Sequence, residues 1–203
     1  MTAVLGEPAR GALGELARGA LGELARSALG ELAQVFDRLS DDAVDELIAA
    51  IASAKRIVVF GCGREGLQMR GLAMRLFHMG RDVSVWGDMT TPAVGGGDLL
   101  IVSAGPGMLA TARTLVEIAS KAGARTALVT ARPDAELARF VDVVAVIPAQ
   151  TMAHDLGPRA SILPMGSLFE TAQMLFFELA ILKLRPMLRE TAETMRRRHT
   201  NLE

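Results

Sequence analysis

Two glycine-rich turns contain the residues of this chain best suited to binding a ligand. The first, residues 61–66, reads GCGREG after the apolar run 57–60, and the second, residues 104–107, reads AGPG after the apolar run 99–103. Each turn leads into a segment with the pattern of a helix. Glycine lets the backbone approach an anion closely, and the first N–H groups of a helix have no partner within it. The two turns therefore predict a binding site for a phosphate group, which we call the phosphate cradle.

Two kinds of ligand fit such a cradle. The pattern G-x-G-x-x-G in residues 61–66, with Asp88 just after the next predicted strand, is typical of dinucleotide-binding folds. Two neighbouring glycine turns suit one compact phosphate-bearing ligand at least as well. Because no residue stands out as a partner in hydride transfer, a dinucleotide-binding oxidoreductase subunit is the less favoured alternative, and no cofactor is expected.

Glu170 is the first candidate for acid–base chemistry. It lies three residues after Ser167, near the start of an apolar segment. The spacing Ser-x-x-Glu is also that of a capping box, in which the two side chains bond to the first turn of a helix. From the residues alone, the cap is favoured over a catalytic role. From the residues alone, His199, at the end of the basic run 196–199, is interpreted as part of an exposed C-terminal turn.

The elements that would position these residues alternate between strand and helix. Strands are predicted at 57–60, 83–86, 99–103, 126–130 and 142–147, and helices at about 64–79, 108–122, 133–139 and 167–184. Runs of Val, Ile and Leu separated by helices indicate a parallel sheet covered on both faces, which binds ligands at the carboxyl ends of its strands. The expected fold is an α/β three-layer sandwich with a five-stranded parallel sheet. The loops after Phe60, Trp86 and Ser103 should form its binding site.

The N-terminal part carries a repeat instead of strands. Residues 10–33 are three near-copies of an octad, RGALGELA, RGALGELA and RSALGELA. Eight residues advance a helix by about 80° beyond two turns, so the leucines spiral around it. We expect a helical extension over residues 1–36, partly frayed or packed on a neighbouring subunit, and a separate domain over 37–203. Ser40 is predicted to cap a further helix from Asp41 to Ala54.

Composition excludes several classes of protein. The net charge is −1 and the chain holds seven Phe, one Trp and no Tyr, which argues against nucleic-acid binding. No apolar run reaches the ~20 residues of a membrane span, and the N-terminus does not resemble a signal peptide. The single cysteine fits a reducing cytoplasm, and the scattered histidines lack the spacing of metal ligands. We expect a cytoplasmic protein that binds neither nucleic acid, membrane nor metal.

Residues 55–111 and 148–202 resemble the sugar isomerase (SIS) domain and, within it, the 6-phospho-3-hexuloisomerases. The resemblance rests on AKRIVVFGCGREG at 54–66, AMRLFHMG at 73–80, the Thr90-Thr91-Pro92 loop and GGDLLIVSAGPG at 96–107. It continues through PAQT at 148–151, SILPMGSLFE at 161–170 and RHTNL at 198–202. PMGSLFE is the most specific of these segments.

The resemblance implies a Rossmann-like domain that isomerises a phosphorylated ketohexose through an enediolate. The reaction would be of the kind that interconverts a 3-hexulose 6-phosphate and fructose 6-phosphate. Glu170 matches the proposed base of the family. His199 matches a histidine thought to enter an active site, which can belong to a neighbouring subunit, and to open the sugar ring or polarise the carbonyl. A homodimer or homotetramer is expected, because the segment 168–182 is apolar nearly all round.

The chain departs from the family in the implied phosphate site. Glu65 stands where the family typically has a serine, and AGPGML at 104–109 replaces a Ser/Thr-rich loop, so that Ser103 and Thr111 are the hydroxyls left nearby. A carboxylate repels a phosphate dianion, and Arg64 could pair with Glu65 or with the ligand. A non-catalytic sugar-phosphate-binding paralogue is therefore the main alternative to an isomerase. The predicted substrate-binding residues are Gly61, Gly63, Arg64, Glu65, Thr90, Thr91, Ser103, Gly105, Gly107 and Thr111.

Overall fold

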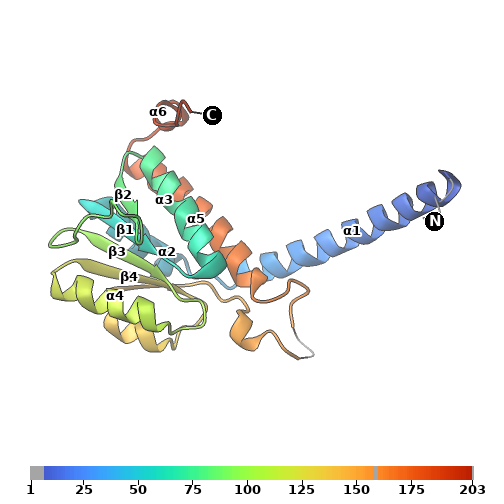
Figure 1. Cartoon of the computed structure of the whole chain (residues 1–203), viewed down its shortest axis with the longest axis horizontal. Helices are drawn as coiled ribbons and strands as arrows, with labels where there is room; N and C mark the ends of the chain where they lie inside the picture. Colours follow the sequence, from blue (N-terminus) through green and yellow to red (C-terminus); the bar gives the residue numbers. More distant parts are fainter. Residues whose placement is uncertain (1–6, 158–159, 203) are drawn as a thin grey trace.

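A parallel five-stranded sheet is the centre of the computed structural model, which describes residues 7–157 and 160–202 (Figure 1). The strands are β1 (Arg56–Phe60), β2 (Asp82–Val85), β3 (Leu99–Ser103), β4 (Arg125–Thr130) and β5 (Val143–Val146), in the order β2-β1-β3-β4-β5. Their β-branched and leucine side chains are buried on both faces along most of β1, β3 and β4. The predicted five-stranded parallel sheet is confirmed.

One face of the sheet is covered by three helices. These are α2 (Asp41–Ser53), α3 (Gly63–His78) and α5 (Ser167–Met187), and α3 and α5 lie side by side against it (Figure 1). Alternate strand residues such as Ile57, Val59 and Ile101 pack with Leu72, Phe176 and other buried helix residues in the larger core. Because α3 and α5 pack side by side on this face, residues about 100 positions apart lie together at the starts of these two helices.

The opposite face is covered less completely. Helix α4 (Ala110–Lys121) and the 3₁₀ helix η1 (Glu136–Phe140) pack there on Val58, Leu100 and Leu128. The connection from β2 to β3, residues 86–98, contains no helix, so the part of this face over β1 is bordered by a loop. The helix predicted at 133–139 is shortened to η1, where Ala131 N and Leu137 N bond to the backbone oxygens of Gly105 and Gly107 in the loop after β3.

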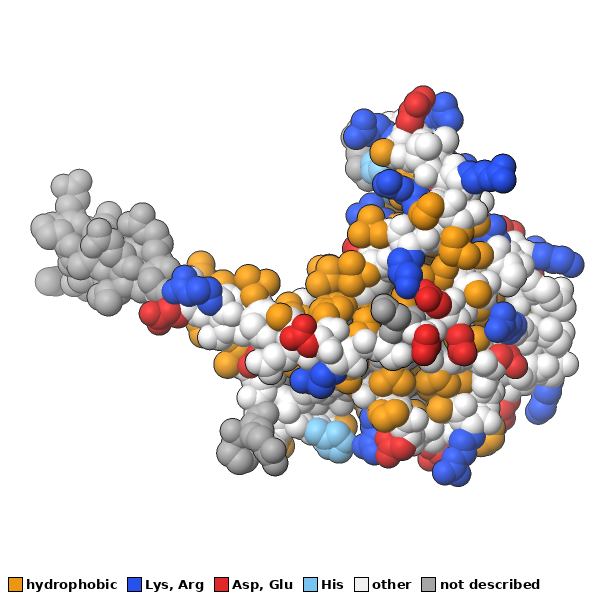
Figure 2. Space-filling view, turned by 180° about the vertical axis from the view of Figure 1, so that it is seen from behind, with side chains coloured by type: hydrophobic (Ala, Val, Ile, Leu, Met, Phe, Trp, Pro, Cys, Tyr) orange, Lys and Arg blue, Asp and Glu red, His pale blue; other side chains and the backbone are white. Residues whose placement is uncertain are grey.

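The predicted N-terminal helix is observed as α1 (Glu7–Phe36), which projects from the body of the molecule (Figure 1). Its last turns pack against α5, where Val35 is fully buried, whereas Leu21, Leu24 and Leu29 are exposed. Hydrophobic side chains are also exposed on the body beside the base of this helix (Figure 2). Residues 1–6 of the predicted extension lie outside the described residues. The boundary between 36 and 37 stays a prediction.

The chain ends in a short helix, α6 (Ala192–Arg197), against the C-terminal end of α3. Arg198 donates to the backbone oxygen of His78 at 2.8 Å and pairs with Glu190 at 2.8 Å. None of the described helices is long and apolar enough to cross a membrane.

Candidate active site

A cavity of about 370 Å³ lies where α3 and α5 begin, at the carboxyl ends of the strands. We call it the Glu170 cavity. Its lining includes four sequence-predicted site residues together with residues of the loops after β3 and β5. The lining residues are Cys62, Gly63, Arg64, Glu65, Pro106, Leu109, Thr151, Met152, Met165, Gly166, Phe169 and Glu170.

The glycines of the first turn serve the packing of α3 against β1. A Cβ atom on Gly66 would lie 2.5 Å from the backbone oxygen of Gly61, and one on Gly61 would lie 3.0 Å from the nitrogen of Gly66. Gly63 begins the helix with φ +55°, a conformation that favours glycine. The G-x-G-x-x-G spacing thus allows the first turn of α3 to lie directly on the end of the strand.

A tight turn places the start of α5. Met165 and Gly166 both have positive φ, of 54° and 77°, and a Cβ atom on Gly166 would lie 2.6 Å from the nitrogen of Met152. Gly166 is the N-cap residue, so that Ser167 falls inside the helix. The PMGS part of the sequence therefore sets the close approach of α5 to residues 151–152, and it directs Glu170 toward the cavity.

The predicted capping box of Ser167 and Glu170 is wrong. No side chain caps α5, and the hydroxyl of Ser167 instead accepts a hydrogen bond from Arg64 Nη1 at 2.8 Å. Arg64 Nε lies 2.9 Å from Glu170 Oε2, in an ion pair where the Glu170 side chain is 14% exposed and that of Arg64 58%. Glu170 is thus held at the cavity by a cation from the other helix.

Glu65 turns away from Arg64 and into the loop after β3. Its Oε2 accepts from the hydroxyl of Ser103 at 2.5 Å and from the backbone N–H of Gly105 at 3.0 Å. Burial raises the pKa of Glu65, and the charge of Glu170 raises it further, against the opposing effect of the bonds from Ser103 and Gly105. The sequence predicted that Arg64 could pair with Glu65 or with the ligand; in the structure it pairs with Glu170, and Glu65 bonds elsewhere.

The donors expected in the second glycine turn are already used. The N–H of Gly105 binds Glu65, Pro106 has none, and the N–H of Gly107 binds the backbone oxygen of Ala104 at 2.9 Å. In this structure the phosphate cradle therefore holds a carboxylate of the protein itself.

Sequence reasoning missed two polar residues near the cradle. Gln173 is fully buried and donates from Nε2 to Ser103 Oγ at 2.7 Å. Its position three residues after Glu170, on the same side of a helix, was the available signal. Arg132 follows β4, packs against Gly107, and lies 3.1 Å from the ring of His154.

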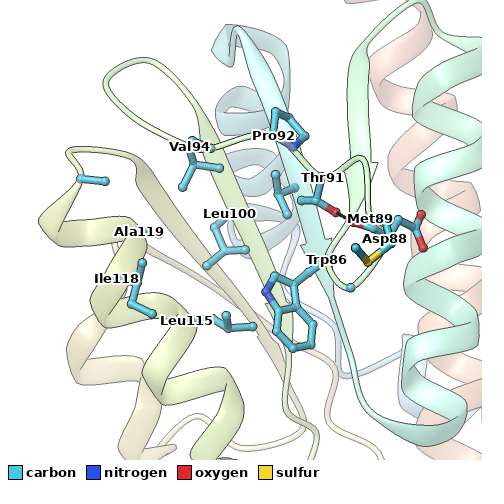
Figure 3. A pocket seen from close by; sticks show the side chains of 14 residues that line it. Trp86, Asp88, Met89, Thr91, Pro92, Val94, Leu100, Leu115, Ile118 and Ala119 are labelled. Carbon is cyan, nitrogen blue, oxygen red and sulfur yellow. Dashed lines mark hydrogen bonds between the residues drawn. The ribbon is translucent and has the colours of Figure 1, made fainter.

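Several predicted binding residues lie outside the Glu170 cavity. Thr111 is exposed on α4, and Thr90 borders a groove beside β2 and α3. Thr91 lines a second cavity of about 670 Å³ on the other face of the sheet, between α4 and the 86–94 loop (Figure 3). Its hydroxyl donates to the backbone oxygens of Val85 and Asp88. The apolar walls of this second cavity include Trp86 and Leu100.

His199 does not reach the Glu170 cavity of its own chain. Its ring lies 5.2 Å from that of His78, at the C-terminal end of α3. Thirteen residues separate His78 from Glu65, which corresponds to about 20 Å along a helix. In this structure His199 therefore lies at the opposite end of α3 from the Glu170 cavity.

The fold and the cavity at its strand ends define an α/β domain with a parallel sheet and a cavity at the carboxyl ends of its strands, and comparison with known proteins assigns its family. Residues 50–175 match the SIS domain model, and the chain belongs to the SIS domain family. A 3-hexulose-6-phosphate isomerase from Mycobacterium gastri is 40% identical over 166 residues, which are 82% of this chain and 83% of the relative. The corresponding enzyme from Bacillus subtilis is 34% identical over 168 residues, covering 81% and 89% of the two chains.

Solved structures agree with this assignment. A hypothetical protein matches with a TM-score of 0.80 and 28% identity, over 90% of this chain and 97% of its own. A protein from Methanococcus jannaschii, whose structure was taken to infer a 3-hexulose-6-phosphate isomerase function, matches with a TM-score of 0.73 and 27% identity, over 91% and 99%.

Proposed function

We propose that this chain is a sugar-phosphate isomerase, acting on ketohexose phosphates of the 3-hexulose 6-phosphate and fructose 6-phosphate type. The isomerase relatives cover more than four fifths of the chain and support the reaction class. The observation that carries the proposal is the carboxylate of Glu170, which is largely buried at a cavity and paired with Arg64 across two helices.

In the proposed reaction, Glu170 removes the proton from the carbon beside the carbonyl and forms an enediolate. The proton is returned to the former carbonyl carbon, and a hydroxyl proton passes from one oxygen to the other, so that the carbonyl moves by one position. A carboxylate suits this task because it accepts and returns a proton without leaving its place. Arg64 would hold the carboxylate toward the cavity.

The test is conversion of 3-hexulose 6-phosphate to fructose 6-phosphate by the purified protein and by Glu170→Gln. A general base contributes about 10²–10⁴-fold, so kcat should fall by that factor in the variant. Loss of an ion pair that is more than half exposed on one side should change stability by less than about 1 kcal/mol. Glu178→Gln is the matched control, since Glu178 lies on the same helix and pairs with Arg75. Equal kcat in both variants would refute the role of Glu170.

The second candidate function is binding of a sugar phosphate without catalysis. The carboxylate of Glu65 supports it over catalysis, because Glu65 takes the donors of Ser103 and Gly105, so that a bound phosphate would lie away from the place that the resemblance to the isomerases implies. A protein that binds fructose 6-phosphate in calorimetry but converts no ketohexose phosphate would support this alternative against the isomerase.

We further propose that the active form is a cytoplasmic homodimer or homotetramer in which His199 enters the cavity of a second copy. The distance of His199 from its own cavity supports this arrangement, as do exposed apolar side chains on α5, including Leu175, Leu179 and Leu182. The histidine would there assist ring opening or polarise the carbonyl.

A further inference from the structure

The carboxylate of Glu65 fits its place in the phosphate cradle closely. Its Oε2 accepts two hydrogen bonds, from the hydroxyl of Ser103 at 2.5 Å and from the N–H of Gly105 at 3.0 Å. A Cβ atom on Gly105 would lie 2.7 Å from the ring of Phe169 and 2.9 Å from Glu65 Oε1, so a larger residue at this position would have to displace the ring or the carboxylate. The loop after β3 is thus shaped to hold an oxyanion, and the oxyanion it holds is a side chain.

Behind this carboxylate lies a buried amide with an unused acceptor. Gln173 is fully buried, and its Nε2 donates to Ser103 Oγ at 2.7 Å, while its Oε1 has no hydrogen-bond partner among the described residues. With Glu65 ionised, the hydroxyl of Ser103 must donate to Glu65. If Glu65 gains a proton and donates to Ser103, the Ser103 hydroxyl needs another acceptor. Turning the Gln173 amide over supplies Oε1 for it, so the cluster accommodates both charge states.

The charges around Glu65 determine which state admits an anion. Glu170 faces it from α5 and Arg64 precedes it on α3, while Ser103 and Gly105 on the third side are uncharged. With both carboxylates ionised, two negative charges stand against one guanidinium in the cavity. An entering oxyanion is repelled in that state, whereas protonation of Glu65 removes one of the two negative charges and with it part of the repulsion. The raised pKa of Glu65 agrees with this second state being accessible.

We propose that Glu65 is the resident anion of the phosphate cradle, and that an oxyanion of the ligand binds there only together with one proton taken up by Glu65. The proposal deepens the proposed function and rests on it for the identity of the ligand, whose phosphate would be that oxyanion. Binding is then tighter at lower pH, and Glu65 decides how strongly the site discriminates between an anionic and a neutral group.

Calorimetric titration with sulfate tests this, because sulfate stays a dianion where phosphate itself titrates. Between about pH 5 and pH 8, the association constant of the wild-type protein should fall by up to about ten-fold per pH unit, the slope of one linked proton. Two buffers of different ionisation enthalpy should show uptake of that proton. Glu65→Gln should lack this component and bind sulfate more tightly at the upper end of the range. Glu178→Gln should behave as wild type.

Equal pH dependence in wild type and Glu65→Gln would overturn the proposal, and so would absence of sulfate binding from both. Wild type and Glu65→Gln keep the same other titratable groups, so the difference between them is the measured quantity. Circular dichroism checks that each variant folds, and Glu65→Ser replaces Glu65→Gln if the latter does not. Isomerase activity is not read in this experiment. Proton-linked sulfate binding without activity would therefore refute only the proposed function.

Discussion

The glycine at position 66 offers a direct test of the packing between α3 and β1. A methyl group there would lie 2.5 Å from the backbone oxygen of Gly61, which cannot move without shifting the end of the strand. Gly71 lies in the same helix, and a Cβ atom on it would meet nothing within 4 Å. Replacing either glycine by alanine gains about 1 kcal/mol of helix propensity, which cancels when the two variants are compared.

The difference between Gly66→Ala and Gly71→Ala therefore measures the overlap alone. Inserting a methyl group into a filled space costs about 1–3 kcal/mol. Gly71→Ala should be as stable as wild type or more so, and Gly66→Ala less stable than Gly71→Ala by that amount. In thermal unfolding, about 2–4 °C per kcal/mol is expected for a chain of this size. If the two variants unfold together, Gly66 is not required by packing, and our explanation of the G-x-G-x-x-G spacing fails.

Three further predictions concern charge and assembly. Burial raises the pKa of Glu65 above its ordinary value of 4.5, so the folded chain keeps this proton at pH values where the unfolded chain has lost it. The free energy of unfolding, relative to that of Glu65→Gln, should therefore fall as pH rises from 4.5. Urea unfolding of both variants across this pH range measures it, and the same pH dependence in both would contradict the prediction. If His199 acts in a second copy, mixing inactive Glu170→Gln with inactive His199→Ala should restore part of the activity after subunit exchange, whereas no recovery would place both groups in one chain or outside the reaction. Light scattering should find a dimer or tetramer at micromolar concentration, and a stable monomer would leave the exposed leucines of α5 without a function.

The strands could be predicted to within one or two residues, because runs such as IVVF and LLIVS are buried on both faces and end at glycines or polar residues. The place of the cavity followed from the same argument, since parallel strands bring their carboxyl ends to one edge. The contacts within it could not be predicted. Arg64 pairs with Glu170, 106 positions away, and not with its sequence neighbour Glu65. This pair forms because α3 packs against α5, which the sequence does not show.

The capping box failed for a related reason. Ser-x-x-Glu has the right spacing, but Gly166, in a left-handed conformation, is the N-cap, so Ser167 is the first residue of the helix instead of its cap. The hydroxyl of Ser167 accepts a hydrogen bond from Arg64. The two glycine turns could be located from the sequence, whereas the carboxylate that bonds to the second turn could not. The contact between Glu65 and this site could not be predicted from a motif, because the carboxylate lies 38 and 40 positions from its two donors, Ser103 and Gly105.

Trp86 gives this chain an unusually simple fluorescence. It is the single tryptophan in a sequence without tyrosine, so emission excited at wavelengths too long for phenylalanine comes from one place. The ring is 43% exposed and stands edge-on to Phe60 at 5.2 Å, at the end of β1. Strand β2, which ends just before it, is an edge strand that pairs, among the strands the structure describes, only with β1. A red shift and easier quenching by iodide should therefore report loosening of this edge before the rest of the sheet unfolds.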